Sequence, residues 1–190
     1  VVDSYNVDSD YLMSLRRAGL LVACVDDLNQ HALPAHIVTN GGAHATGLKY
    51  LSVTGDTRYL LGPEFALLGP EYGRPTNRTG ERTVKNMLVT LGGSDPHHLM
   101  PGLLSMLDDV TGSFQVTAII GPFFGNRAKV EASARSSRRA VRLVCDPPSM
   151  RDHQFEADMA ISAGGQTLYE LAATGTPAVA LQMVANQHES

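Results

Sequence analysis

The sequence predicts an α/β fold built on parallel sheets, and three observations support this. Apolar runs of strand length alternate with segments whose apolar residues recur at helical spacing. Several runs are continuously apolar, as in parallel strands that are buried on both faces. Glycine turns follow some of these runs and precede helices. At 190 residues, with 43% hydrophobic residues, the chain can form one large domain or two small ones.

The first half reads as strands that alternate with one helix. The expected elements are the end of a strand at residues 1–2, a helix over 11–18, and strands over 20–25 and 36–39. Asp8 or Ser9 is placed to cap the helix and Gly19 to close it. Two similar segments, 60–65 and 67–72, follow, and we interpret them as turns that each dock an aromatic residue rather than as a repeat architecture.

A polar stretch rich in Pro, Gly and Asn predicts the domain organisation. We expect a first domain over residues 1–73, a linker over 74–85 and a second domain over 86–190. In the second domain the expected strands are 87–91, 114–120, 141–145, 157–162 and 178–183. The expected helices are 96–107, 127–136, 150–155 and 167–173, with Pro96 in the first turn and Ser94 or Asp95 as cap.

Two glycine turns, 92–94 and 164–167, predict a ligand site in this second domain. In a doubly wound sheet of order 3-2-1-4-5, the first and fourth strands are neighbours, and ligands bind where the chain reverses direction between them. The two turns follow those strands, so two helix N-termini suited to anions would face one crevice. Glu170 follows closely and could accept hydrogen bonds from ribose hydroxyls. We therefore predict a nucleoside diphosphate as ligand.

Several other functions are disfavoured by the sequence. The glycine patterns of NAD or FAD sites and of P-loop nucleotide sites are absent. A net charge of -4 without a basic stretch argues against nucleic acid, and no apolar run is long enough for a transmembrane helix. Cys24 and Cys145 each end an apolar run and are expected to be buried, reduced thiols, which favours a cytoplasmic location. The spacing of the seven histidines suggests no metal site.

A set of motifs, in order along the chain, supports a more specific interpretation. They are Asp3 to Tyr5, residues 25–28, residues 60–63 through Tyr72, residues 92–96, residues 162–167 with Glu170, and Asn186 with Gln187. Together they resemble the nucleotide-sugar hydrolases of pseudaminic acid biosynthesis. These are UDP-2,4-diacetamido-2,4,6-trideoxy-β-L-altropyranose hydrolases, and they are close to spore-coat polysaccharide biosynthesis proteins.

The resemblance implies a glycosyltransferase-B architecture. It has two Rossmann-like domains, here the first partial and the second nearly complete but for its last helices, with the ligand in the cleft between them. It also implies water attack on the anomeric carbon of a UDP-sugar, without metal or cofactor. The implied UDP-binding residues are Gly93, Ser94, Gly164, Gly165, Gln166, Thr167 and Glu170, and the implied sugar contacts are Tyr5, Asn40, Asn186 and Gln187. The family's histidine base is expected upstream of Val1, so no catalytic residue is assigned here.

Three interpretations of function stay open at this point. A UDP-sugar hydrolase leads, a glycosyltransferase that uses the same donor site comes second, and a nucleotide-binding chain without catalysis comes third. Asp26 and Asp27 could serve as an acid–base pair, although we favour a structural role at the end of a strand.

Overall fold

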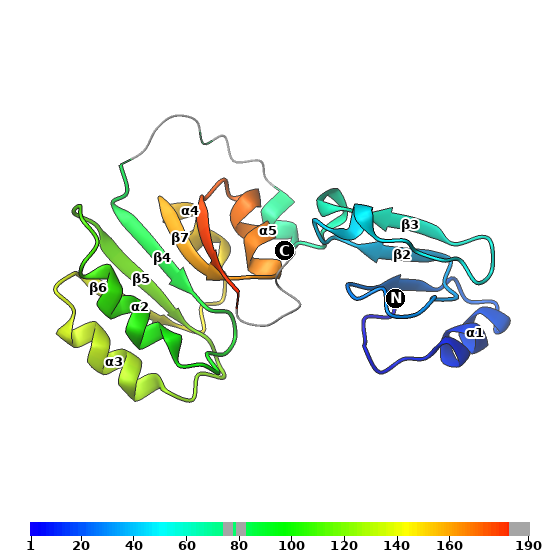
Figure 1. Ribbon diagram of the computed structural model, residues 1–190, viewed down its shortest axis with the longest axis horizontal. Coiled ribbons are helices and arrows are strands. Elements are labelled where there is room, and N and C mark those ends of the chain that lie inside the picture. The colour runs from blue at the N-terminus through cyan, green and yellow to red at the C-terminus, as the bar shows by residue number, and fades with distance from the viewer. Residues whose placement is uncertain (74–77, 79–82, 183–190) are drawn as a thin grey trace. The chain divides into compact units, whose positions relative to one another are not determined.

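The computed structural model describes residues 1–73, 78 and 83–182, and the chain divides into two compact units (Figure 1). One unit spans Val1–Leu67 and the other Leu68–His188. Of the expected linker 74–85, only Arg78 and residues 83–85 are described, so the domain limits stay a prediction. Among the described residues, no helix combines the length and the apolar character needed to cross a membrane.

The first unit is a three-stranded parallel sheet with a helix packed on it. The strands β1 (Ala23–Val25), β2 (Ile37–Asn40) and β3 (Arg58–Leu61) lie in the order β1-β2-β3. The helix α1 (Ser9–Arg17) begins where Asp8 accepts a hydrogen bond from the Tyr11 N–H at 2.8 Å, as the cap prediction required. Leu12 of α1 joins Val22, Cys24, Ala35 and Val38 in a small buried cluster.

Two predictions for this unit are corrected. The expected strand 20–25 begins only at Ala23, and Leu20 and Leu21 are 53% and 73% exposed. Those two residues lie in the connection between α1 and β1, before the chain joins the sheet, so the sheet does not bury their side chains. The strand β3 was missed because its last two residues, Leu60 and Leu61, were interpreted as the start of the first of the two similar turn segments.

The second unit is a five-stranded parallel sheet with helices on both faces. Its strands are β4 (Asn86–Thr90), β5 (Gln115–Ile120), β6 (Val141–Cys145), β7 (Met159–Ala163) and β8 (Ala178–Leu181). They lie in the order β6-β5-β4-β7-β8, which confirms the expected order 3-2-1-4-5. The helices are α2 (Leu99–Leu107), α3 (Arg127–Ser136), α4 (Arg151–Glu156) and α5 (Gln166–Ala173). The fold class predicted from the sequence, α/β with two Rossmann-like parallel sheets, is thus confirmed.

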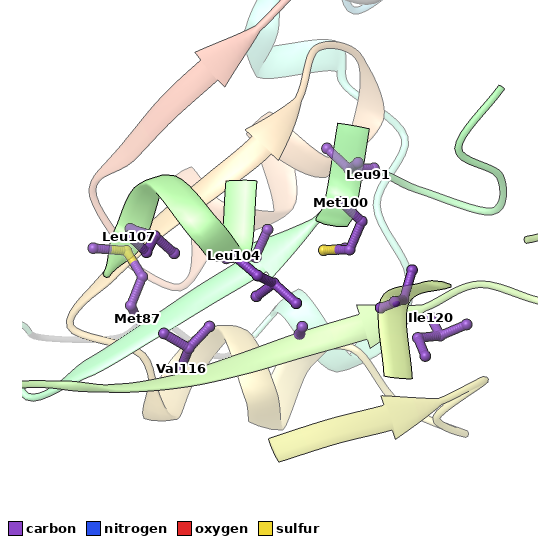
Figure 2. Close-up of a cluster of buried hydrophobic side chains, with 10 residues drawn as sticks. Met87, Leu91, Met100, Leu104, Leu107, Val116 and Ile120 are labelled. Carbon is purple, nitrogen blue, oxygen red and sulfur yellow. The ribbon is translucent and has the colours of Figure 1, made fainter. Parts of the chain in front are cut away.

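Alternation along the strands divides the core of this unit between its two faces. Figure 2 shows one face, where Met87, Val116 and Ile120 from the sheet meet Met100 and Leu104 of α2. The intervening strand residues Leu88, Ile119 and Ala160 point the other way and pack with Ala157 and with Leu171 of α5 in a second buried cluster. Both faces are buried, which explains why the central strands are continuously apolar.

The expected helix 96–107 starts at Leu99, three residues later than predicted. The preceding His98 has a left-handed backbone conformation, with φ at 54°, so the chain cannot be helical there. The expected burial of Cys145 is also wrong. Cys24 is buried, but Cys145 is exposed because it ends β6, an edge strand that pairs only with β5 among the described strands.

Candidate functional site

A cleft of about 220 Å³ lies at the carboxyl edge of the five-stranded sheet. Its residues come from the ends of β4, β5 and β6 and from the start of α5. They are Thr90, Gly92, Gly93, Ile119, Gly121, Pro122, Asp146, Pro147, Met150, Thr167 and Glu170. The structure thus brings the first glycine turn and the start of α5 to one cleft, in keeping with the strand order. Of the proposed UDP-binding residues, Gly93, Thr167 and Glu170 line it.

The turn after β7 leads into α5 through a glycine. Gly165 is the residue before the helix and has φ at 103°, a conformation that residues other than glycine rarely adopt. Within the residues that the structure describes, no side-chain hydrogen bond caps this helix end, and Thr167 of its first turn lines the cleft. The remaining predicted residues of this turn, Gly164, Gly165 and Gln166, do not themselves line the cleft. This turn retains the anion-suited character that the sequence predicted.

The turn after β4 differs, because the helix that follows it is already capped. The buried carboxylate of Asp95 accepts hydrogen bonds from the backbone N–H groups of Leu99 and Met100, at 2.8 and 2.9 Å. Asp95 was one of the two caps that the sequence predicted, and because it occupies the start of α2, this helix end offers fewer N–H groups to an anion than the sequence suggested. Within the part of the chain that the structure describes, nothing accepts from the backbone N–H groups of Gly93 and Ser94, so the turn itself can still donate to an anion.

Gly121, which the sequence analysis did not single out, holds the loops of the cleft together. A Cβ atom at this position would lie 2.5 Å from the carbonyl oxygens of both Gly92 and Gly93. The loop after β5 also donates from the Phe123 N–H to the Gly93 carbonyl at 3.0 Å. Only a residue without a side chain permits this approach, so Gly121 lets the loop after β5 pack directly against the backbone of the first glycine turn.

The carboxylate of Glu170 is held from the side away from the cleft. Gln154 of α4, which is fully buried, donates from Nε2 to Glu170 Oε2 at 2.9 Å. The buried Tyr72 hydroxyl donates to Gln154 Oε1 at 2.8 Å. Neither Tyr72 nor Gln154 was predicted as a site residue, since both read as ordinary core positions. A second carboxylate, that of Asp146, lines the cleft on a left-handed backbone with φ at 40°.

In the first unit, the proposed sugar contacts Tyr5 and Asn40 belong to a polar cluster after β1 and β2. The Tyr5 hydroxyl donates to Asp27 at 2.8 Å, and 72% of Tyr5 is exposed. Asn40 is buried, donates to the Tyr50 hydroxyl at 2.9 Å and accepts from the Gly42 N–H at 2.8 Å. Tyr5 can therefore reach a ligand, whereas the amide of Asn40 is already used inside the unit.

Asp26 and Asp27 both accept hydrogen bonds from phenols in this cluster. Asp26 accepts from the Tyr50 hydroxyl at 2.6 Å and from the Asn29 N–H at 3.0 Å, which closes a turn. The hydrogen bond to Asp27, together with burial, raises the pKa of Tyr5 to about 12. Burial, followed by the hydrogen bond to Asp26, also raises the pKa of Tyr50. Asp26 thus has the structural role at the strand end that the sequence favoured.

The other predicted residues give no further geometry. Asn186 and Gln187 lie outside the described residues. Among the described residues, no group of three or more His, Cys, Asp or Glu side chains could hold a metal ion, and no histidine lines the cleft.

Comparison with known proteins gives two relatives and a structural neighbour. The sequence matches no protein family profile. It is 29% identical over 139 residues to the spore coat polysaccharide biosynthesis protein SpsG of Bacillus subtilis, covering 71% of this chain. It is 24% identical over 198 residues to the uncharacterized protein MJ1062 of Methanocaldococcus jannaschii, covering the whole chain. The crystal structure of MurG from Acinetobacter baumannii matches 95% of the chain with a TM-score of 0.60 and 15% identity.

The structural match concerns the fold of the chain. The likeness to MurG supports the glycosyltransferase-B type of fold that the sequence predicted, with two Rossmann-like units. The chain spans 40% of SpsG, 41% of MJ1062 and 52% of the MurG chain.

Proposed function

We propose that this chain binds a UDP-sugar, with the diphosphate and ribose in the cleft of the second unit. The observation that carries the proposal is that Gly93 of the first glycine turn and Thr167 and Glu170 of α5 line one cleft. Backbone N–H groups of the turn at Gly93 and of the uncapped start of α5 suit phosphate oxygens, because they supply donors without bulk. The carboxylate of Glu170 suits ribose hydroxyls, which donate to it. The relationship to a polysaccharide biosynthesis protein supports a sugar-linked nucleotide.

We further propose that the reaction is hydrolysis, with a UDP-linked diacetamido-trideoxy-hexose of pseudaminic acid biosynthesis as substrate. Water would attack the anomeric carbon, the bond from that carbon to the phosphate oxygen would break, and UDP would leave. A general base must take the proton from water. No described histidine lines the cleft, so we predict that this chain binds UDP and turns over little substrate by itself.

Calorimetry with UDP tests the binding proposal. We expect binding by the chain, and for Glu170→Ala an affinity for UDP lower by about tenfold, as for the loss of hydrogen bonds to a charged group. Binding of inorganic pyrophosphate should not change, because it carries no ribose. Equal UDP affinity for both proteins would remove Glu170 from the ribose role.

Incubation with the UDP-sugar and no acceptor tests the reaction. Free sugar and UDP would support hydrolysis. A donor that stays intact until an acceptor is added would favour the glycosyltransferase interpretation. The fold likeness to MurG makes this second reaction worth testing, since the same kind of donor site serves either outcome.

A further inference from the structure

The side chains behind Glu170 form a buried chain of hydrogen bonds with a defined direction. Glu170 is a carboxylate and can only accept, so Gln154 must turn its NH₂ group toward it. The carbonyl oxygen of Gln154 then faces Tyr72, which must donate its hydroxyl proton. The hydrogen bonds therefore run in one direction. Tyr72 donates to Gln154, and Gln154 donates to Glu170.

Tyr72 and Gln154, which form this relay of hydrogen bonds to Glu170, are both shielded from solvent. Gln154 has no exposed surface and Tyr72 is 9% exposed. Burial, and the nearby carboxylates of Glu170 and Glu71, raise the pKa of Tyr72, so its phenol stays protonated and keeps donating. The backbone carbonyl of Gln154 is also fixed, because it accepts from the Thr176 hydroxyl at 2.6 Å. Gln154 is therefore held at both its side chain and its backbone.

This arrangement decides how Glu170 meets a ligand. Its Oε2 atom accepts a hydrogen bond from Gln154, and the Tyr72 hydroxyl also lies close to the carboxylate, so Oε1 is the oxygen left for a ligand. A free glutamate samples several rotamers and loses that freedom on binding, whereas an anchored one is ordered in advance. Tyr72 and Gln154 do not line the cleft, so they can affect a ligand there only through Glu170.

We infer that Tyr72 and Gln154 are positioning residues that fix the Glu170 carboxylate with Oε1 toward the cleft, and that this relay makes the site select ribose over deoxyribose nucleotides. The inference rests on the proposed nucleotide site. A carboxylate held in one orientation places its acceptor at one point, where a 2′-hydroxyl either donates or is missing. A mobile carboxylate would adapt to either sugar and discriminate less.

The test compares UDP, 2′-deoxy-UDP and pyrophosphate by calorimetry, using wild type, Tyr72→Phe, Gln154→Met and Thr176→Val. For Tyr72→Phe and Gln154→Met we expect UDP affinity to fall about fivefold and the preference for UDP over 2′-deoxy-UDP to shrink toward unity, with pyrophosphate unchanged. The double variant should lose no more preference than Gln154→Met alone, because both residues act through one carboxylate. Thr176→Val loses a buried hydrogen bond to α4 and should melt earlier, yet keep the wild-type preference.

A second readout needs no nucleotide. In wild type the side-chain amide protons of Gln154 should exchange slowly with solvent in NMR spectra, and in Tyr72→Phe they should exchange faster. The inference is overturned if Tyr72→Phe retains the ribose preference while Glu170→Ala abolishes it. If wild type binds no UDP, the proposed function fails, and the selectivity that depends on it fails as well. The amide exchange then still reports whether the relay exists.

Discussion

The two sheets of this chain end in polar groups of different kinds at their carboxyl edges. The first unit presents side chains that bond to one another, with Tyr50 between Asn40 and Asp26. The second unit presents backbone N–H groups and a cleft, and its side-chain hydrogen bonds hold Asp95 behind the first turn and Glu170 beside the cleft. An edge whose side chains satisfy each other stabilises its own unit, whereas an edge of glycine turns leaves donors for a ligand. The contrast supports the proposal that the second unit binds the diphosphate.

Breaking the cleft loops should have the largest effect. Gly121→Ala places a Cβ 2.5 Å from two carbonyl oxygens of the first glycine turn, and backbone atoms cannot move aside as side-chain ends can. We expect a loss of at least about 3 kcal/mol in unfolding free energy, measured by denaturant titration.

Gly102→Ala is the matched control for that substitution. Gly102 lies inside α2, and a Cβ there meets nothing within 4 Å. This variant should gain about 0.5–1 kcal/mol, because alanine favours helix. Equal effects at the two positions would contradict the packing argument.

The polar edge of the first unit offers the next largest effect. Asn40→Ala removes a buried amide and leaves the Gly42 N–H and the Tyr50 hydroxyl without it. The expected loss is about 1–3 kcal/mol of unfolding free energy. UDP affinity should stay at the wild-type value, because Asn40 belongs to the other unit. A weaker UDP affinity in this variant would contradict the proposal that the edge of the first unit has a structural role and that UDP binds at the second.

Capping of α2 by Asp95 should matter less, because the effect is confined to one helix end. Asp95→Ala leaves the N–H groups of Leu99 and Met100 without their acceptor and should cost about 1–2 kcal/mol. Asp95→Asn keeps an acceptor oxygen and should lose less. Stronger UDP binding by Asp95→Ala would mean that the freed N–H groups at the start of α2 contact the ligand.

Tyr5→Phe should change stability least. Tyr5 is largely exposed, so at neutral pH the expected loss is under about 1 kcal/mol. The folded pKa of Tyr5 is raised to about 12, which is above its ordinary value. The stabilisation is therefore complete below about pH 10, where the unfolded tyrosine is also protonated, and is lost as the pH rises toward 12.

Absorbance of the phenolate and alkaline unfolding both report this change. In Tyr5→Phe, the unfolding free energy should fall less between about pH 10 and pH 12 than it does in the wild type. If Tyr5 is a sugar contact, the affinity for a UDP-sugar should also fall in Tyr5→Phe while the affinity for UDP stays constant. An unchanged affinity for the UDP-sugar would show that Tyr5 does not contact the sugar.

Local sequence patterns were enough for most of the second unit. The ranges predicted for α3 and β6 match the structure, since alternating apolar residues and flanking turn residues fix such elements locally. The start of α2 was missed because the carboxylate of Asp95 reaches forward to Leu99 and Met100, which no propensity expresses. The exposed Leu20 and Leu21 were misread because burial depends on where the sheet begins rather than on residue type.

The sequence by itself indicated the α/β class and pointed to Gly93, Thr167 and Glu170, which line the cleft once the strands take the common doubly wound order that was assumed for them. Tertiary structure decided what lies behind them. Gly121 supports the first turn from 29 positions further along than Gly92. Gln154 and Tyr72 reach Glu170 from two other elements. Local patterns report which way the backbone turns, whereas the partner of a buried polar group depends on contacts between distant segments, and these form only when the sheet assembles.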